Sequence, residues 1–163
     1  MKRLQTVHIA VALASSALLM AACASKPATI GSAPSAVDVV TRTGELPPQT
    51  LPPGACGLFL WTNGEPLRFV FFSKAGTDTA VMDVDGEERA LRLTSAKGDL
   101  FGQFMTRMTY ASDKGNVGVS FRPGEQLDGG QRIDGGRLSL VDKDGWETMI
   151  PVFGLSACQP DSQ

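Results

Sequence analysis

Glycine-bearing turn dipeptides, spaced regularly between short apolar runs, leave this chain few ways to fold. They occur at Asn63-Gly64, Ala75-Gly76, Asp85-Gly86, Lys97-Gly98, Lys114-Gly115 and Asp144-Gly145. A glycine in such a pair supplies the positive φ angle that a tight β-hairpin requires. The spacing therefore predicts strands near residues 57–61, 67–73, 79–84, 88–94, 101–110, 116–122, 136–141 and 147–154.

Apolar and polar side chains alternate within these runs, most clearly in residues 104–110 and 117–122. A period of two means that one face of a strand packs while the other meets solvent. Residues 67–72 are almost continuously apolar, which predicts a strand that is buried on both faces. The sequence therefore predicts an all-β, antiparallel fold of about eight strands, either a small barrel or a sandwich.

The N-terminus has the pattern of an export signal. A basic start precedes the fourteen small and apolar residues Ile9–Ala22, a run that suits a signal peptide and is too short to span a membrane. Met20-Ala21-Ala22-Cys23 then resembles the lipobox of bacterial lipoproteins. That resemblance implies cleavage before Cys23, lipidation of its thiol, acylation by chains such as palmitate, and sorting to the outer membrane. Ordinary secretory cleavage is the alternative, because Ala22-Cys23-Ala24 also has small residues at the required positions.

Composition divides the chain into three parts. We expect a lipoprotein signal peptide at residues 1–22, a tether that starts at the lipidated cysteine and covers residues 23–53, and a β-domain at residues 54–163. The tether holds six of the ten prolines and no aromatic residue. Because such a composition cannot bury a core, we expect the tether to be disordered. The domain would then face the periplasm from a lipid anchor in the membrane.

Two cysteines, Cys56 and Cys158, flank the interval that holds all eleven aromatic residues. In an exported protein such a pair usually forms a disulfide, and two buried free thiols are the alternative. Closing a loop of this size stabilises a fold by about 4–5 kcal/mol in the chain-entropy treatment. Because the bond would join the first strand to the segment after the last, we expect a barrel in preference to a sandwich.

Charge and histidine content exclude several classes of function. Fifteen Lys and Arg against 17 Asp and Glu give a net charge of −2, which provides no basic field for nucleic acid. The single histidine, His8, lies in the expected signal peptide. The mature chain therefore lacks the base of Ser-His-Asp and Cys-His catalysis and the ligands of histidine-containing zinc sites. We expect no cofactor, no metal and no catalytic residues.

Acidic residues cluster at two places, and a short repeat lies between them in the sequence. Residues 83–88 and 142–145 surround Asp-Gly pairs and indicate solvated turns in preference to calcium or glycosidase sites. Asp128-Gly129-Gly130 recurs six residues later as Asp134-Gly135-Gly136. We expect this repeat to form a long polar loop or a bulged hairpin, and such a loop can also bind a ligand.

Five residues are candidates for binding a partner, namely Tyr110, Lys114, Gly115, Trp61 and Trp146. Both tryptophans lie beside predicted turns, where an indole either caps the core or offers a ligand platform. The layout of lipobox, tether and cysteine-flanked β-domain resembles the membrane-bound inhibitors of c-type lysozyme.

The segment from Tyr110 to Gly115 carries most of that resemblance. It is similar to the family's Tyr-x-x-x-Thr-Lys-Gly motif, with Asp113 in place of the threonine and two residues instead of three between Tyr110 and Asp113. Gly98 and Phe101 match its Ser-Gly-x-x-Tyr motif in part, because Lys97 stands where the family has serine. The resemblance implies that Lys114 and its neighbours enter a lysozyme cleft, and two ordinary Lys-Gly hairpin turns are the alternative.

Three functional hypotheses remain open. We expect first a non-enzymatic lipoprotein of the cell envelope whose disulfide-closed β-domain binds an envelope protein or has a structural role. The second is a lysozyme-inhibitor-like binding module. The third is a carboxylate-dependent hydrolase, which would need two acidic groups within about 5–9.5 Å of each other.

Overall fold

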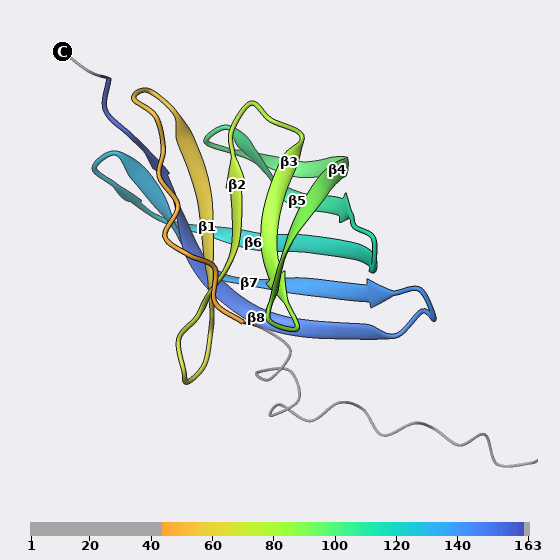
Figure 1. Ribbon diagram of the computed structural model, residues 1–163. Coiled ribbons are helices and arrows are strands. Elements are labelled where there is room, and N and C mark those ends of the chain that lie inside the picture. The colour runs from red at the N-terminus through yellow and green to blue at the C-terminus, as the bar shows by residue number, and fades with distance from the viewer. Residues whose placement is uncertain (1–43, 162–163) are drawn as a thin grey trace, which may run out of the picture. The chain divides into compact units, whose positions relative to one another are not determined.

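The computed structural model describes residues 44–161, which form eight antiparallel strands. The strands are β1 (Cys56–Thr62), β2 (Phe69–Lys74), β3 (Thr79–Val84), β4 (Glu87–Phe101), β5 (Phe104–Ala111), β6 (Gly115–Leu127), β7 (Gly130–Asp142) and β8 (Glu147–Cys158). Each strand pairs with the next one along the chain, and β8 pairs with β1, so the sheet closes into a barrel (Figure 1). The prediction of a small all-β barrel is confirmed, and the sandwich is not formed.

Successive strands run in opposite directions, so the hairpin turns gather at the two ends of the barrel. Cys56 and Cys158 are direct partners in the β1–β8 ladder and form the predicted disulfide, with their Cα atoms 3.9 Å apart. We call this end the disulfide end. The opposite end holds the β3–β4, β5–β6 and β7–β8 turns at residues 85–86, 112–114 and 143–146, which we call the Lys114 rim.

Inward-facing side chains from all eight strands fill the barrel. Phe71 of β2 meets Tyr110 of β5 edge to face, with ring centroids 5.5 Å apart. Phe101 of β4 meets Phe121 of β6 in the same way at 5.0 Å. All four rings are buried. Because burying a large apolar side chain stabilises a fold by about 1.5–3 kcal/mol, this interior accounts for much of the domain's stability.

Several expected strands have different bounds in the structure. Lys97-Gly98 is not a hairpin turn, because β4 continues to Phe101 and its register to β5 shifts between Lys97 and Leu100. The positive φ of Gly98 (90°) serves this bulge, and the hairpin turn follows at Gly102. Leu67 lies before β2 and is largely exposed. The prediction of a strand buried on both faces at residues 67–72 is therefore wrong at its start.

The Asp-Gly-Gly repeat forms a long bulged hairpin between β6 and β7, one of the two forms that the sequence predicts. Its first copy makes the turn at Asp128-Gly129. Its second copy lies where the register of β7 to β8 shifts between Ile133 and Gly136. The register of β6 to β7 also shifts near Pro123. The bulges bend this hairpin, and both strands extend beyond their predicted bounds.

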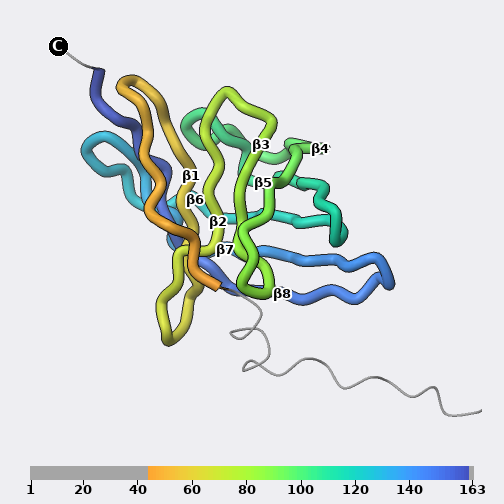
Figure 2. Tube along the Cα trace, in the orientation of Figure 1, coloured from red at the N-terminus to blue at the C-terminus, as the bar shows by residue number. Residues whose placement is uncertain are grey.

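Residues 44–55, which we call the N-terminal strap, run along the outside of β1 before the chain enters the barrel (Figure 2). The N–H of Leu46 donates to the carbonyl of Phe69 at 2.8 Å, and the N–H of Gly54 donates to the carbonyl of Gln159 at 3.0 Å. Leu46 is only 3% exposed. Residues 44–53, which the prediction assigned to the tether, therefore include residues that pack on the barrel, and Leu46 is buried there.

Candidate functional site

The β3–β4 turn of the Lys114 rim is a two-residue hairpin turn. Asp85 and Gly86 both have positive φ, 58° and 79°, as the Asp-Gly pair predicts. The carboxylate of Asp83, which is buried, accepts a hydrogen bond of 3.0 Å from the N–H of Gly86. This acidic segment therefore forms the predicted turn, and the buried carboxylate of Asp83 holds the turn in place.

The β5–β6 turn presents Lys114 to solvent. The hydroxyl of Ser112 donates to the carbonyl of Gly115 at 3.0 Å and accepts from the N–H of Lys114 at 3.2 Å. Gly115 has a φ of 145°, and a Cβ at this position would clash with the carbonyl oxygen of Val141. The glycine therefore lets β6 lie close to β7, while Ser112 fixes the shape of the turn that carries Lys114.

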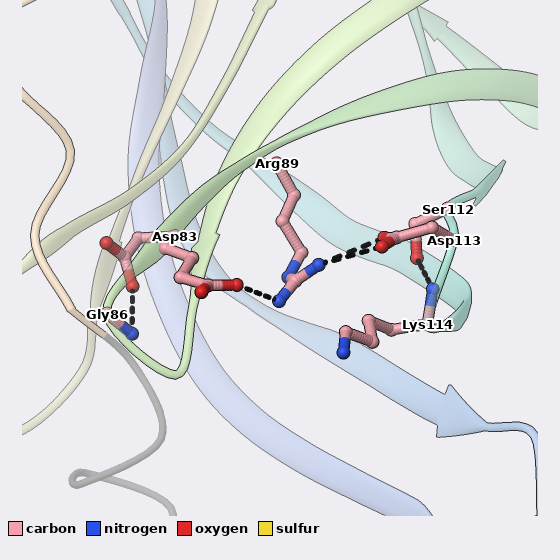
Figure 3. A network of polar contacts seen from close by, with 7 residues as sticks. Asp83, Gly86, Arg89, Ser112, Asp113 and Lys114 are labelled. Atoms are coloured by element: carbon pink, nitrogen blue, oxygen red, sulfur yellow. Dashed lines mark hydrogen bonds and ion pairs between the residues drawn. The ribbon is translucent and has the colours of Figure 1, made fainter.

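Arg89 ties this turn to β4. Its guanidinium donates to Glu87 at 2.5 Å and to the two carboxylate oxygens of Asp113 at 3.0 and 3.1 Å (Figure 3). The side chain of Arg89 is 10% exposed, and its Nε has no hydrogen-bond partner among the described residues. Figure 3 shows the Asp113 contact immediately beside the turn from which Lys114 projects. The buried arginine thus anchors the residue that precedes Lys114.

The β7–β8 turn presents Trp146. The carboxylate of Asp142 accepts hydrogen bonds from the N–H groups of Asp144, at 3.0 Å, and of Trp146, at 2.9 Å. The carbonyl of Trp146 accepts in turn from the N–H of Asp142 at 3.0 Å. The backbone beside the indole is therefore held in place, while the side chain itself remains 57% exposed.

These three turns surround a small cavity of about 150 Å³, which we call the Lys114 cavity. Its walls come from the ends of β3 and β4, from the β5–β6 turn and from the β7–β8 turn. Five of the residues that line it are Asp85, Arg89, Lys114, Asp142 and Trp146. Lys114 has no ion-pair partner among residues 44–161, whereas Arg89 is paired and Asp142 accepts two backbone hydrogen bonds. The cavity therefore offers a free ammonium group beside an exposed indole.

The structure brings together three of the five predicted binding residues, since Lys114, Gly115 and Trp146 all line this cavity. Trp61 lies elsewhere, on the outer face of β1. Tyr110 points into the barrel and is 1% exposed, so it offers no surface to a partner. Its candidacy for binding is therefore corrected to a role in the core. Burial raises the pKa of the Tyr110 phenol, and a contact with Ser73 opposes that change in part.

Arg89 and Asp113 are the site residues that sequence reasoning missed. They lie 24 positions apart, and their contact depends on β4 and β5 being neighbours that reach the same end of the barrel. Arg89 stands in a run of charged residues after a predicted turn, which indicates a solvated strand end. The substitution of Asp113 into the lysozyme-inhibitor motif was visible in the sequence, but nothing there identified its partner.

Two kinds of feature are absent from the part of the chain that the structure describes, namely a metal-binding cluster and a membrane-spanning helix. Residues 44–161 contain no group of three or more His, Cys, Asp or Glu side chains placed to hold a metal ion. Within the same residues, no helix has the length and apolar character needed to cross a membrane. The predicted signal peptide and the lipidation site at Cys23 lie outside the described residues.

Comparisons with known proteins add no relative. No protein family, no curated protein and no solved structure matches this chain.

Proposed function

We propose that this chain is a non-enzymatic, lipid-anchored protein of the bacterial cell envelope that binds a protein partner through its Lys114 rim. The anchor would be the acylated Cys23, and the partner would be another envelope protein. Export is supported by the N-terminal apolar run and by the lipobox-like segment that ends at Cys23. The Cys56–Cys158 bond supports it as well, because structural disulfides persist in oxidising compartments such as the periplasm.

The observation that carries the binding proposal is that Lys114 and Trp146 both line one small cavity. The turns that carry them are fixed by hydrogen bonds from Ser112 and to Asp142. Rigid presentation reduces the ordering entropy that binding would otherwise lose. Tryptophan is enriched among residues that dominate binding energy, and a peripheral lysine speeds association with an acidic partner. A surface that carries acidic groups beside an apolar side chain would therefore complement this rim.

Capture from solubilised envelopes tests the proposal. The chain from Ala24 onward, with the disulfide intact, would be immobilised and exposed to detergent-extracted envelope proteins. We expect one stoichiometric partner, and we expect Lys114→Ala and Trp146→Ala each to weaken its retention. Lys74→Ala is the matched control, because Lys74 is an exposed lysine at the disulfide end. Equal retention by all variants, or no stoichiometric partner, would contradict binding through the rim.

A lysozyme-inhibitor-like module is the second candidate, and the exposure of Lys114 favours it. The ammonium stands on a hairpin turn with no ion-pair partner among the described residues, as a group that inserts between the carboxylates of a glycosidase cleft would require. Adding the soluble chain to a c-type lysozyme tests this alternative directly. Inhibition that is dose-dependent and is lost in Lys114→Ala, but not in Lys74→Ala, would make lysozyme the partner. Unchanged lysozyme activity would reject it.

The hydrolase hypothesis receives less support from the cavity. Asp142 accepts two backbone hydrogen bonds, so its carboxylate is committed to the β7–β8 turn. Asp85 occupies the tight β3–β4 turn. General acid–base chemistry requires a carboxyl group that is free to exchange a proton with the substrate. We therefore keep the non-enzymatic proposal ahead of the hydrolase.

A further inference from the structure

A second concave surface lies on the outer face of the barrel, away from the Lys114 rim. It follows β8 between β1 and the long β6–β7 hairpin, and encloses about 520 Å³. Trp61 and Phe153 form one wall, and Leu127 contributes to the other. We call it the Trp61 groove. Its volume falls in the range of small-molecule binding sites.

The aromatic wall of the Trp61 groove is preorganised. Trp61 and Phe153 are direct partners in the β1–β8 ladder, with ring centroids 6.2 Å apart and planes inclined by 27°. Phe59 and Phe69 support the indole from the other side, at 6.3 and 5.2 Å. Because its neighbours hold the indole, a ligand that packs on it loses little entropy in ordering it.

Three polar side chains complete the groove, namely Asn63, Arg132 and Asp134. All three are exposed, and none has a side-chain hydrogen bond or ion pair with any residue in the range 44–161. The backbone of Asn63 is fixed by a 2.8 Å hydrogen bond to the carbonyl of Pro151. Arg132 donates, Asp134 accepts and Asn63 does both. One cation and one anion leave the groove without net charge.

We infer that the Trp61 groove binds a neutral oligosaccharide. The C–H face of a pyranose ring packs on an aromatic wall, and its hydroxyl groups both donate and accept hydrogen bonds, which matches the three polar side chains. The balance of Arg132 and Asp134 favours an uncharged ligand over a polyanion. An extended peptide does not fit as an added strand, because β8 is already paired on both sides. An acyl chain would use the apolar wall and leave the polar groups without a role.

Chitotetraose, an uncharged β-linked oligosaccharide, is the probe for this site. The whole mature chain from Ala24 onward carries two tryptophans, so Trp146→Phe leaves Trp61 as the only indole that reports. We expect a saturable change in the emission of Trp61 as chitotetraose is added. Cellotetraose and lauric acid are titrated in parallel, to separate recognition of the sugar from uptake of an acyl chain.

Variants then locate the site. Trp61→Ala removes the aromatic platform. We expect the affinity for chitotetraose, measured by calorimetry, to fall about thirtyfold. Asp134→Ala and Arg132→Gln change exposed side chains without touching the core, and we expect each to weaken binding about tenfold. Trp146→Ala is the matched control and should bind like the parent chain.

Several outcomes would overturn this inference. They are an absence of saturation with either sugar, binding of lauric acid alone, and full affinity in Asp134→Ala and Arg132→Gln. Because those two variants leave the Lys114 rim intact, a failure here is independent of the proposed partner binding. Each variant's thermal unfolding is recorded, so that loss of binding is not confused with loss of fold.

Discussion

The carboxylate of Asp83 accepts a 2.8 Å hydrogen bond from the backbone N–H of Gly44, a residue 39 positions earlier in the chain. The same oxygen also accepts from the N–H of Gly86 in the β3–β4 turn. Asp83 is 6% exposed, so one buried carboxylate fixes both the N-terminal strap and a turn of the Lys114 rim. The acidic run that suggests a solvated turn therefore contains a structural acceptor.

Replacing Gly44 by alanine should release the N-terminal strap. A Cβ on Gly44 would clash with the carboxylate of Asp83, so this carboxylate must shift and we expect the hydrogen bond between them to weaken. We expect residues near Leu46 to detach and the exposed Glu45 to become a cleavage site for a glutamate-specific protease. Cleavage rate measured by mass spectrometry checks this prediction. Gly64→Ala, at a glycine with open space around it, is the control and should leave the rate unchanged.

Removing the disulfide should destabilise the barrel strongly. Cys56 and Cys158 close a loop with a sequence separation of 102 residues. Loss of such a bond raises the conformational entropy of the unfolded chain. We therefore expect the double variant Cys56→Ser, Cys158→Ser to lower the free energy of unfolding by about 2–5 kcal/mol. Urea denaturation under non-reducing conditions measures the difference. A change below about 1 kcal/mol would show that the β1–β8 hydrogen bonds alone maintain the closure.

Tyr110 should make the fold sensitive to alkali. Burial raises its pKa above the ordinary value of 10.0. Above pH 10 the phenol therefore ionises in the unfolded chain while it keeps its proton in the folded one, which favours unfolding. The stability that Tyr110 contributes is complete below pH 10 and is lost as the pH rises through the raised pKa.

Two measurements check this alkaline sensitivity. Tyr110 is the only tyrosine, so the ultraviolet absorbance of tyrosinate follows this residue alone, and it should appear above pH 10 or together with unfolding. Tyr110→Phe should lose less stability between neutral and alkaline pH than the parent chain. At neutral pH it should lose less than about 1 kcal/mol, because the hydroxyl lies 3.5 Å from Ser73. Ionisation at the ordinary pH in the folded chain would contradict the burial argument.

Arg89 and Asp113 should contribute unequally to stability although they are partners. The arginine side chain is 10% exposed and the aspartate 69%. We expect Arg89→Ala to lower the free energy of unfolding by about 1–3 kcal/mol through lost packing of its stem, and Asp113→Ala by at most about 0.5 kcal/mol. Denaturant unfolding of both variants measures the difference.

Arg89→Met separates packing from charge in that pair. Methionine keeps much of the buried stem and removes an Nε that has no hydrogen-bond partner among the described residues. We expect its stability to lie within about 1 kcal/mol of the parent chain. If Arg89→Met and Arg89→Ala were equally unstable, the ion pairs with Glu87 and Asp113 would be the main contribution of Arg89.

Local patterns predicted most of the barrel. A meander joins each strand to the next, so turn signals such as Asp85-Gly86 and Asp144-Gly145 also identify the strands that pair. The prediction of a hairpin turn at Lys97-Gly98 was wrong, because a glycine with positive φ suits a bulge as well as a turn. Only the pairing with the partner strand decides between the two. The strap could not be predicted, since a single leucine in a proline-rich segment has no periodicity.

The sequence predicted several residues of the candidate site, but it did not predict that they line one cavity. Lys114 and Trp146 were identified one at a time, and they line the same cavity because alternate turns of a meander lie at the same end. Two sequence patterns gave conflicting predictions for Tyr110. Strand alternation correctly placed it with the inward residues Phe104 and Met108, whereas the family resemblance suggested a binding role that its burial excludes.

The position of the disulfide determines how the chain carries mechanical tension. A pull on the segment before residue 44 would first peel the strap from Phe69 and then reach Cys56. From there the covalent bond passes the load directly to Cys158, at the far end of the last strand. The strands between the two cysteines are therefore bypassed when the two ends of the chain are pulled apart. Force spectroscopy should record the extension of the strap and no unravelling of the barrel until the disulfide is reduced.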